Sequence, residues 1–287
     1  MSMEIQRVGV IGAGTMGNGI AQVFAAGGYD VIMRDLTPQY LDRGMTTIAK
    51  SLDRLTTRGK MTSEQRDATL SRIRPTTELS ALADCQFLVE AILESYDLKA
   101  GVIRELDTIC SPDTIFATNT SSISVTRIAA ASKIPSRVVG MHFFNPVPVM
   151  QLVEIIRALQ TTDAVCQSVV TLTNSLGKTA RVSKDSYGFV VNRVLVPMIN
   201  EAINCVHEGL ASPEDIDVMM KLGANHPMGP LTLADLIGLD VVLDIMETLY
   251  GGFDDPKFRP SPLLKQMCDA GYLGRKVGRG FFTYNQA

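Results

Sequence analysis

The stretch Val8-Gly9-Val10-Ile11-Gly12-Ala13-Gly14-Thr15-Met16-Gly17 decides the fold, because it places three spaced glycines between an apolar strand and the start of a helix. Gly12 allows a tight turn, Gly14 lets the backbone approach a phosphate, and Gly17 lets the helix pack closely on the strand. The N-terminus of the helix offers unpaired N–H groups to an anion. Residues 12–17 are therefore predicted to bind the pyrophosphate of a dinucleotide.

An acidic residue follows at the end of the second predicted strand. A helix is expected over residues 18–27 and a strand over residues 29–34, with Asp35 directly after it. A carboxylate here can bind a ribose 2′-hydroxyl and repels the 2′-phosphate of NADP, so Asp35 favours NAD. Arg34 leaves NADP as an alternative, although alternation along the strand directs its side chain to the opposite face. Without this context, a glycine-rich turn of an ordinary α/β protein would be the simpler interpretation.

The composition limits the classes of protein to which the chain can belong. Its 287 residues, 46% of them hydrophobic, suffice for two cores, so we expect two domains. The net charge of −3 argues against nucleic acid and membrane partners, and the apolar runs are too short to span a bilayer. Five widely spaced cysteines without a C-x-x-C pair predict neither disulfides nor a metal site. No leader pattern precedes the first strand, so we expect a cytoplasmic protein.

Apolar strands alternate with helices through the first part of the chain. Strands are expected over residues 85–92, 115–119, 137–142 and 149–156, with helices over residues 97–109 and from near residue 124. A long polar helical stretch over residues 40–74, broken near Gly59, predicts a helical hairpin that projects from the sheet. The alternation predicts an α/β fold, with a doubly wound Rossmann-type sheet that binds ligands at the carboxyl ends of its strands.

Long helical patterns replace this alternation near residue 187. We therefore predict an NAD-binding Rossmann domain over residues 1–184 and an all-helical domain over residues 185–287 that binds substrate and forms a dimer. A helix predicted over residues 231–249 is apolar around much of its circumference. This favours a homodimer through the helical domain, while a helix at the centre of a monomeric bundle is the alternative.

Two polar clusters follow neighbouring strands of the predicted sheet. They are Asn119-Thr120-Ser121-Ser122 and His142-Phe143-Phe144-Asn145-Pro146, and both should reach the nucleotide edge of the sheet. Hydride transfer from an alcohol to a nicotinamide requires a base, and histidine takes and returns protons near pH 7. Of the three histidines, His207 is expected to complement a helix dipole and His226 to pack in a loop. His142 is therefore the candidate base, although position alone also fits an ordinary packed histidine.

A carboxylate interrupts the apolar strand Leu152-Val153-Glu154-Ile155-Ile156. Burial of an unpaired charge is costly, so Glu154 needs a cationic or N–H partner. His142 is the available one. A carboxylate in this position would fix the tautomer of the imidazole and favour its protonated form.

Four motifs of the chain resemble those of the L-3-hydroxyacyl-CoA dehydrogenase family. They are residues 10–17, 119–122 and 140–146 and the stretch Gly188-Phe189-Val190-Val191-Asn192-Arg193. The resemblance covers the whole chain, and the chain is most similar to short-chain bacterial members. It implies a reversible, NAD-linked interconversion of an (S)-3-hydroxyacyl-CoA and a 3-oxoacyl-CoA, with (S)-3-hydroxybutyryl-CoA and acetoacetyl-CoA as the expected pair.

The resemblance also implies roles for particular residues. His142 would exchange the proton of the 3-hydroxyl group, and Glu154 would orient His142. Ser121 and Asn192 would hydrogen-bond the reacting oxygen, which implies a site in the cleft between the two domains. The further cofactor contacts that it implies are Glu94, Lys99, Asn119, Asn145 and Lys276.

Coenzyme A is expected to meet the helical hairpin. Lys50, Ser51, Arg54 and Arg58 recur three and four residues apart, so they share one face of a helix. A cationic face suits the phosphates of the coenzyme, although spacing alone also fits an ordinary solvated face. The resemblance implies that Ser51, Arg54 and Arg58 bind the substrate.

Two other functions are compatible with these features. A β-hydroxyacid dehydrogenase that acts on a free acid shares the glycine motif and a helical second domain, but such enzymes generally use a lysine base. A structural or regulatory protein could also bind NAD without turnover. The pair of His142 and Glu154 argues against both, and turnover of acetoacetyl-CoA would discriminate among the three.

Overall fold

The computed structural model describes residues 5–284. The chain divides into two compact units, the first ending at Asp185 and the second beginning at Ser186. Among the residues described, no helix is long and apolar enough to cross a membrane.

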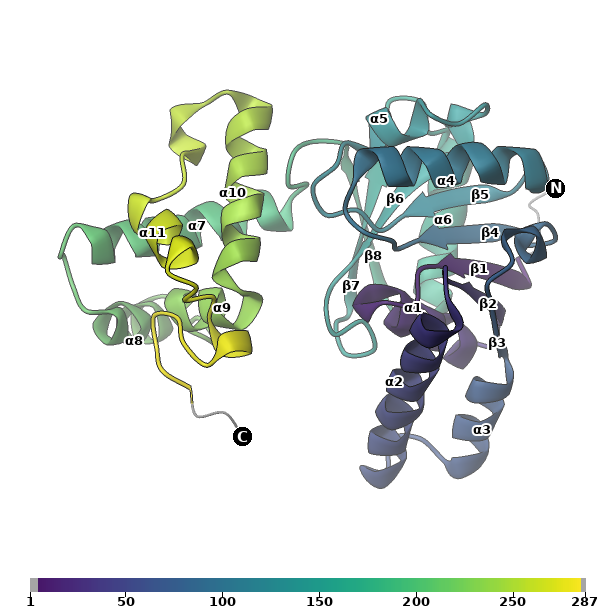
Figure 1. The fold of residues 1–287 in the computed structure, drawn as a ribbon, viewed down its shortest axis with the longest axis horizontal. Helices are drawn as coiled ribbons and strands as arrows, with labels where there is room; N and C mark the ends of the chain where they lie inside the picture. The colour runs from purple at the N-terminus through teal and green to yellow at the C-terminus, as the bar shows by residue number, and fades with distance from the viewer. Residues whose placement is uncertain (1–4, 285–287) are drawn as a thin grey trace. The chain divides into compact units, whose positions relative to one another are not determined.

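The first unit is built on one eight-stranded sheet (Figure 1). Its strands are β1 (Arg7–Ile11), β2 (Asp30–Arg34), β3 (Ile73–Thr76), β4 (Phe87–Glu90), β5 (Ile115–Thr118), β6 (Val138–Phe143), β7 (Leu152–Arg157) and β8 (Thr179–Lys184). Their order across the sheet is β3-β2-β1-β4-β5-β6-β7-β8. Only β6 and β7 pair in antiparallel fashion, and all other neighbours are parallel. The predicted doubly wound, mostly parallel sheet is confirmed.

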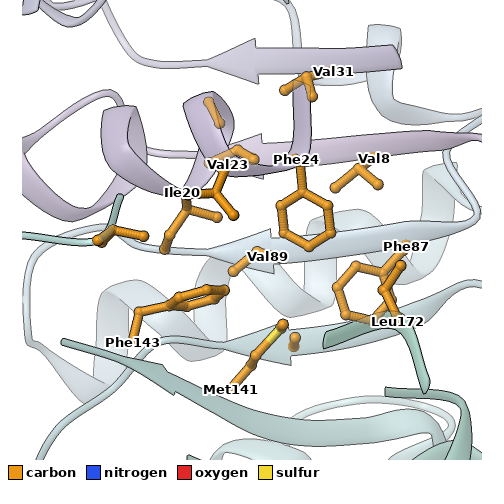
Figure 2. Close-up of a cluster of buried hydrophobic side chains, with 14 of the residues drawn as sticks. Val8, Ile20, Val23, Phe24, Val31, Phe87, Val89, Met141, Phe143 and Leu172 are labelled. Carbon is orange, nitrogen blue, oxygen red and sulfur yellow. The ribbon is translucent and has the colours of Figure 1, made fainter. Parts of the chain in front are cut away.

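Six α-helices connect these strands. They are α1 (Thr15–Ala26), α2 (Pro38–Thr57), α3 (Ser63–Ser71), α4 (Tyr96–Ile109), α5 (Val125–Ala129) and α6 (Asp163–Ser175), with short 3₁₀ turns at Leu79–Leu82 and Pro135–Arg137. Figure 2 shows how Val8 of β1 faces Phe24 of α1 and how Leu172 of α6 joins the same apolar cluster. Phe24 is completely buried there. Helix α4 crosses the sheet on its other face (Figure 1).

Several boundaries differ from those predicted. Helix α1 begins at Thr15 rather than at residue 18, so the glycine motif itself forms the first turn. Strand β7 begins at Leu152 rather than at residue 149, because the N–H groups of Val149 and Met150 turn back to the carbonyl of Pro146. The edge strands β3 and β8 were not predicted, since both are short and carry several polar residues.

The predicted helical hairpin is present and projects from the sheet as α2 and α3 (Figure 1). Helix α2 ends where Gly59 takes a φ of +66°, a left-handed conformation that glycine adopts without strain. The second helix of the hairpin is shorter than expected, because the chain enters β3 at Ile73. At the base of the hairpin, a Cβ added to Gly44 would lie 2.9 Å from the carbonyl oxygen of Ala13. Helix α2 therefore packs directly on the glycine loop.

The second unit is all-helical, as predicted. Its helices are α7 (Val191–His207), α8 (Pro213–Gly223), α9 (Pro230–Ile237), α10 (Leu239–Phe253) and α11 (Pro262–Asp269), with 3₁₀ turns at Pro256–Phe258 and Arg275–Val277. The single helix predicted over residues 231–249 is wrong. Gly238 has a φ of +104°, which ends α9 and starts α10 in a new direction.

The apolar residues of this broken helix mostly serve the core of their own unit. Leu239, Val242, Met246 and Leu249 of α10 are completely buried. Exposed apolar side chains gather instead on α8, where Met219 is 62% and Leu222 is 82% exposed. Val218, Met219 and Leu222 of α8 are thus among the apolar residues that the second unit leaves exposed.

Candidate active site

The glycine loop joins β1 to α1 in a conformation that requires its glycines. A Cβ on Gly12 would lie 2.5 Å from the carbonyl oxygen of Ala91, and one on Gly17 would lie 1.8 Å from that of Gly12. Gly14 is different, because a Cβ there would meet no atom within 4 Å. Gly14 is also the N-cap of α1, and no side chain caps this helix. Open space beside uncapped N–H groups fits the pyrophosphate of a dinucleotide.

Asp35 stands beside this loop, one residue after the end of β2. Its Oδ2 accepts a hydrogen bond of 2.6 Å from the N–H of Ala13, and its Oδ1 accepts one from Leu36. The guanidinium group of Arg34 turns to the carbonyl oxygen of Thr77, with an Nε–O distance of 3.2 Å. The carboxylate, and not the guanidinium group, is thus held against the glycine loop.

His142 and Glu154 form a buried pair on neighbouring strands. The two residues lie opposite one another in the antiparallel register of β6 and β7, and His142 Nδ1 is 2.8 Å from Glu154 Oε2. His142 is only 6% exposed and Glu154 only 3%. The imidazole ring also contacts the ring of Phe144, with 4.6 Å between the centroids. A carboxylate at this nitrogen fixes the tautomer and orientation of the imidazole.

Asn119 ties together the carboxyl ends of three adjacent strands. Its side-chain Oδ1 accepts a 2.9 Å hydrogen bond from the N–H of Phe143 at the end of β6. Its own N–H donates to the carbonyl oxygen of Glu90 at the end of β4. The residue therefore sets the spacing between His142 on β6 and the loop of residues 119–122, which we name the Ser121 loop.

Glu94 holds the Ser121 loop from the other side. Its Oε1 accepts hydrogen bonds from the hydroxyl of Thr120 at 2.5 Å and from the N–H groups of Ser121 at 2.9 Å and Ser122 at 3.1 Å. Burial raises the pKa of Glu94, but the ammonium group of Lys99 and these hydrogen bonds outweigh it and hold the pKa below its usual value. Glu94 thus binds its own chain as an ionised carboxylate.

Lys99, expected as a cofactor contact, lies inside the first unit. It is 1% exposed, and its Nζ is 2.8 Å from Glu90 Oε1 and 3.2 Å from Glu94 Oε2. Glu90 was not predicted as a functional residue. The apolar strand predicted over residues 85–92 contains this one carboxylate. Because burial of an unpaired charge is costly, Glu90 could have been identified in the same way as Glu154.

A cavity of about 320 Å³ lies between the glycine loop and α2. It is lined by Ala13, Gly14, Thr15, Asn18, Gly19, Gln22, Arg43, Gly44, Thr47, Ser51, Arg54, Asn145, Pro146, Val147 and Pro148. The predicted Ser51, Arg54 and Asn145 are thus brought together around one cavity. Sequence reasoning missed Arg43, although its spacing of eleven residues from Arg54 places both on one helix face.

The remaining predicted residues lie elsewhere. Arg58 is exposed at the end of α2 and does not line this cavity. Asn192 is half-buried in the first turn of α7 in the second unit. In the same unit, Lys276 Nζ is 2.5 Å from Asp240 Oδ2. Within residues 5–284, no group of three or more His, Cys, Asp or Glu side chains is placed to hold a metal ion.

These features define a class of protein. A Rossmann sheet supplies the dinucleotide loop after β1, and a buried histidine and carboxylate pair stands at the carboxyl end of β6 in the same sheet. This combination is typical of nicotinamide-dependent dehydrogenases, in which the cofactor accepts a hydride and a protein base accepts a proton.

Comparisons with known proteins identify the family. The sequence model of the 3-hydroxyacyl-CoA dehydrogenase NAD binding domain matches residues 7–186, and that of the C-terminal domain of the same enzymes matches residues 188–284. The chain therefore belongs to the 3-hydroxyacyl-CoA dehydrogenase family, whose cofactor is NAD(H).

Individual relatives are similar over their whole length. A probable 3-hydroxybutyryl-CoA dehydrogenase of Deinococcus radiodurans is 54% identical, with 97% of this chain and 100% of the relative covered. A 3-hydroxybutyryl-CoA dehydrogenase of Bradyrhizobium diazoefficiens is 48% identical, with 100% and 98% covered. The crystal structure of an (S)-3-hydroxybutyryl-CoA dehydrogenase from Ralstonia eutropha superposes with a TM-score of 0.96 at 51% identity, covering 99% of this chain and 100% of that one.

Proposed function

We propose that this NAD-dependent dehydrogenase interconverts (S)-3-hydroxybutyryl-CoA and acetoacetyl-CoA. The buried pair of His142 and Glu154 carries the proposal, because it supplies an oriented proton acceptor at the nucleotide edge of the sheet. The names of the relatives from Deinococcus radiodurans and Bradyrhizobium diazoefficiens support the short acyl chain.

His142 is proposed to act as the general base and acid. Because Glu154 engages Nδ1, the proton of the 3-hydroxyl group passes to Nε2 during oxidation and returns from it during reduction. NAD, when bound, would supply the acceptor for the hydride that leaves C3. Glu154 orients the ring and stabilises the imidazolium.

Ser121 and Asn192 are proposed to hydrogen-bond the reacting oxygen. A hydroxyl and an amide that donate to this oxygen stabilise its developing charge in the transition state. They also hold C3 at the right distance for hydride transfer. Ser121 belongs to the first unit and Asn192 to the second.

The cofactor is proposed to follow the glycine loop. Residues 12–17 hold the pyrophosphate through N–H groups, and Asp35 binds the ribose hydroxyls. The proposed further contacts are Glu94, Asn119, Asn145 and Lys276. The carboxylate of Asp35 beside the N–H of Ala13 supports this assignment, because it places a ribose acceptor next to the phosphate site.

The basic face of α2 is proposed to bind the phosphates of coenzyme A. Ser51 and Arg54 line the cavity beside the glycine loop, and Arg43 adds a second guanidinium group on the same face. Arg58 lies one turn beyond Arg54, where it can contact a more distant phosphate. Planar guanidinium groups suit phosphate oxygens because they donate two hydrogen bonds at once.

The second unit is proposed to form a homodimer and to contribute to substrate binding. Exposed apolar residues on α8 support the dimer, since uncovered apolar surface of this kind usually marks an interface. The helix predicted over residues 231–249 is two helices, α9 and α10, so the dimer is proposed to form through the face of α8 that carries Val218 and Leu222.

A reducing cytoplasm is proposed as the location. The five cysteines are all free thiols, and burial raises the pKa of Cys85 to about 12 and those of Cys110 and Cys268 to about 11. Such thiols are poor nucleophiles and are typical of core residues in a reducing compartment.

Loss of NADH absorbance on addition of acetoacetyl-CoA tests the proposed reaction. Acetoacetate serves as the free-acid competitor, and NADPH is assayed in parallel. Turnover of the thioester with NADH supports the proposal. Turnover of the free acid alone would transfer the assignment to a β-hydroxyacid dehydrogenase, and NADH binding without any turnover would leave a non-catalytic protein.

A further inference from the structure

A buried chain of charged groups links the end of β4 to the Ser121 loop. Glu90, the last residue of β4, is 3% exposed and pairs with Lys99 in the first turns of α4. Lys99 in turn pairs with Glu94, whose Oε1 accepts from the N–H groups of Ser121 and Ser122. We name Glu90, Lys99 and Glu94 the charged triad.

Glu90, the most deeply buried carboxylate of the charged triad, is held by hydrogen bonds at both of its oxygens. Glu90 Oε1 accepts a 2.7 Å hydrogen bond from the N–H of Ile92, and Oε2 accepts one of 2.7 Å from the hydroxyl of Thr118 at the end of β5. Both carboxylate oxygens of Glu90 are therefore engaged by the sheet. This fixes the place of the Lys99 ammonium group, because the three partners of Glu90 approach from the loop after β4, from the end of β5 and from α4.

Stability alone does not account for such an arrangement. Desolvation of buried charges offsets most of their mutual attraction, so apolar replacements of similar volume are often neutral or stabilising. The charged triad instead fixes the positions of the groups that it joins, because charge-assisted hydrogen bonds are short and directional. The lowered pKa of Glu94 agrees with this, since Lys99 and the loop hydrogen bonds keep the carboxylate ionised and therefore able to accept from four donor groups of residues 120–122.

We propose that Glu90 and Lys99 are positioning residues, which act through Glu94 to hold Ser121 where it meets the reacting oxygen. This rests on the role proposed above for Ser121. It also gives Lys99 a place in the reaction without direct contact with the cofactor, as its 1% exposure requires.

The same helix provides a matched control. Near the other end of α4, Asp107 pairs with Arg137 through a contact of 2.5 Å, and both side chains are buried. Asp107 also accepts a hydrogen bond from the hydroxyl of Ser132, away from the Ser121 loop. A substitution that breaks this pair removes a buried ion pair from α4 but leaves the hydrogen bonds of the Ser121 loop unchanged.

A double-mutant cycle tests the proposal. The kcat/KM for acetoacetyl-CoA is measured for Lys99→Met, Ser121→Ala and the double variant, with Arg137→Met in place of Lys99→Met as the control. We expect Lys99→Met to lower kcat/KM by about tenfold in the wild-type background and by less than about twofold in the Ser121→Ala background. Arg137→Met should lower kcat/KM by the same factor in both backgrounds, because the free-energy effects of distant substitutions add.

The outcomes separate the two proposals. Equal factors for Lys99→Met in both backgrounds would overturn the positioning role, since Lys99 would then act independently of Ser121. If Ser121→Ala leaves kcat/KM unchanged, the role proposed for Ser121 fails, and the inference fails with it. If Lys99→Met does not fold, Glu90→Gln replaces it in the same cycle, because the amide has the same size and can still accept from Ile92.

Discussion

Glu154 lies directly opposite His142 in the antiparallel register of β6 and β7, and 2.8 Å separates Glu154 Oε2 from His142 Nδ1. Residues 144–151 carry the chain from the end of β6 back into β7, so residues twelve apart in sequence meet across the ladder. Facing residues on one side of a sheet come within direct contact of each other. The reversal of β7 is therefore what joins the proposed base to its carboxylate.

Replacement of His142 by glutamine should abolish most turnover but leave cofactor binding intact. Loss of a general acid and base costs at least about a hundredfold in rate. NADH affinity, measured by fluorescence, should stay within about twofold, since the glycine loop is unchanged. His207→Gln is the control, because His207 lies at the end of α7 and should have no part in the reaction. Near-normal turnover of His142→Gln would remove His142 from the mechanism.

Alanine at Arg43 or Arg54 should weaken binding of coenzyme A. Each charge-assisted hydrogen bond contributes about 1.5–3 kcal/mol, so KM for acetoacetyl-CoA should rise about tenfold or more, with a smaller change in kcat. A truncated thioester that lacks the phosphates should show no such rise. Arg74→Ala, an exposed arginine on β3, is the control. An equal effect on the truncated substrate would place the two arginines outside the coenzyme site.

Serine at Asp35 should reduce the preference for NADH. The carboxylate repels the additional phosphate of NADPH, and its removal should lower the ratio of kcat/KM values for NADH and NADPH by at least about tenfold. Affinity for NADH should also fall, because the hydrogen bond from Ala13 weakens. The same ratio in wild type and variant would show that Asp35 does not select the cofactor.

Replacement of Glu94 by glutamine should lower the stability of the protein at neutral pH. The loss of stability relative to wild type should be smaller at acid pH. The pKa of Glu94 is held below its ordinary value of 4.5, so the ionised carboxylate stabilises the fold above that pH. This contribution is lost as the pH falls through the lowered pKa. The difference in Tm between wild type and Glu94→Gln should therefore be constant at neutral pH and shrink as the pH falls below 4.5. Glu208→Gln, an exposed carboxylate at the end of α7, should show no such trend.

Glutamate at Leu222 should dissociate the proposed dimer. Leu222 is 82% exposed on α8, and a buried charge at an apolar interface is costly. Light scattering should give about twice 31.1 kDa for wild type and a single chain mass for the variant. The exposed Leu159 of the first unit provides the matched change, Leu159→Glu, which should leave the mass unaltered. A wild-type mass of one chain would refute the dimer outright.

Much of the fold could be predicted because it depends on local patterns. The glycine motif, the apolar strands and the change to helical periodicity near residue 187 each depend on neighbouring residues only. Gly238 shows where such reasoning ends. The apolar pattern runs through this residue without interruption, and only its φ of +104° divides one predicted helix into two. The edge strands β3 and β8 were missed for a related reason, since a polar strand becomes evident only beside its neighbour.

By itself, the sequence determined the nucleotide-binding sheet, the helical second part and the residue types of the site. The spacing of Gly12, Gly14 and Gly17 requires a particular backbone, and that requirement is local. Apart from the contact between His142 and Glu154, which the sequence predicted, tertiary structure decided which polar groups are partners. The resemblance implied that Lys99 contacts the cofactor, whereas the structure places it between Glu90 and Glu94, because the first turn of α4 lies beside the end of β4. Contacts of this kind depend on how elements distant in sequence are packed, which no local pattern encodes.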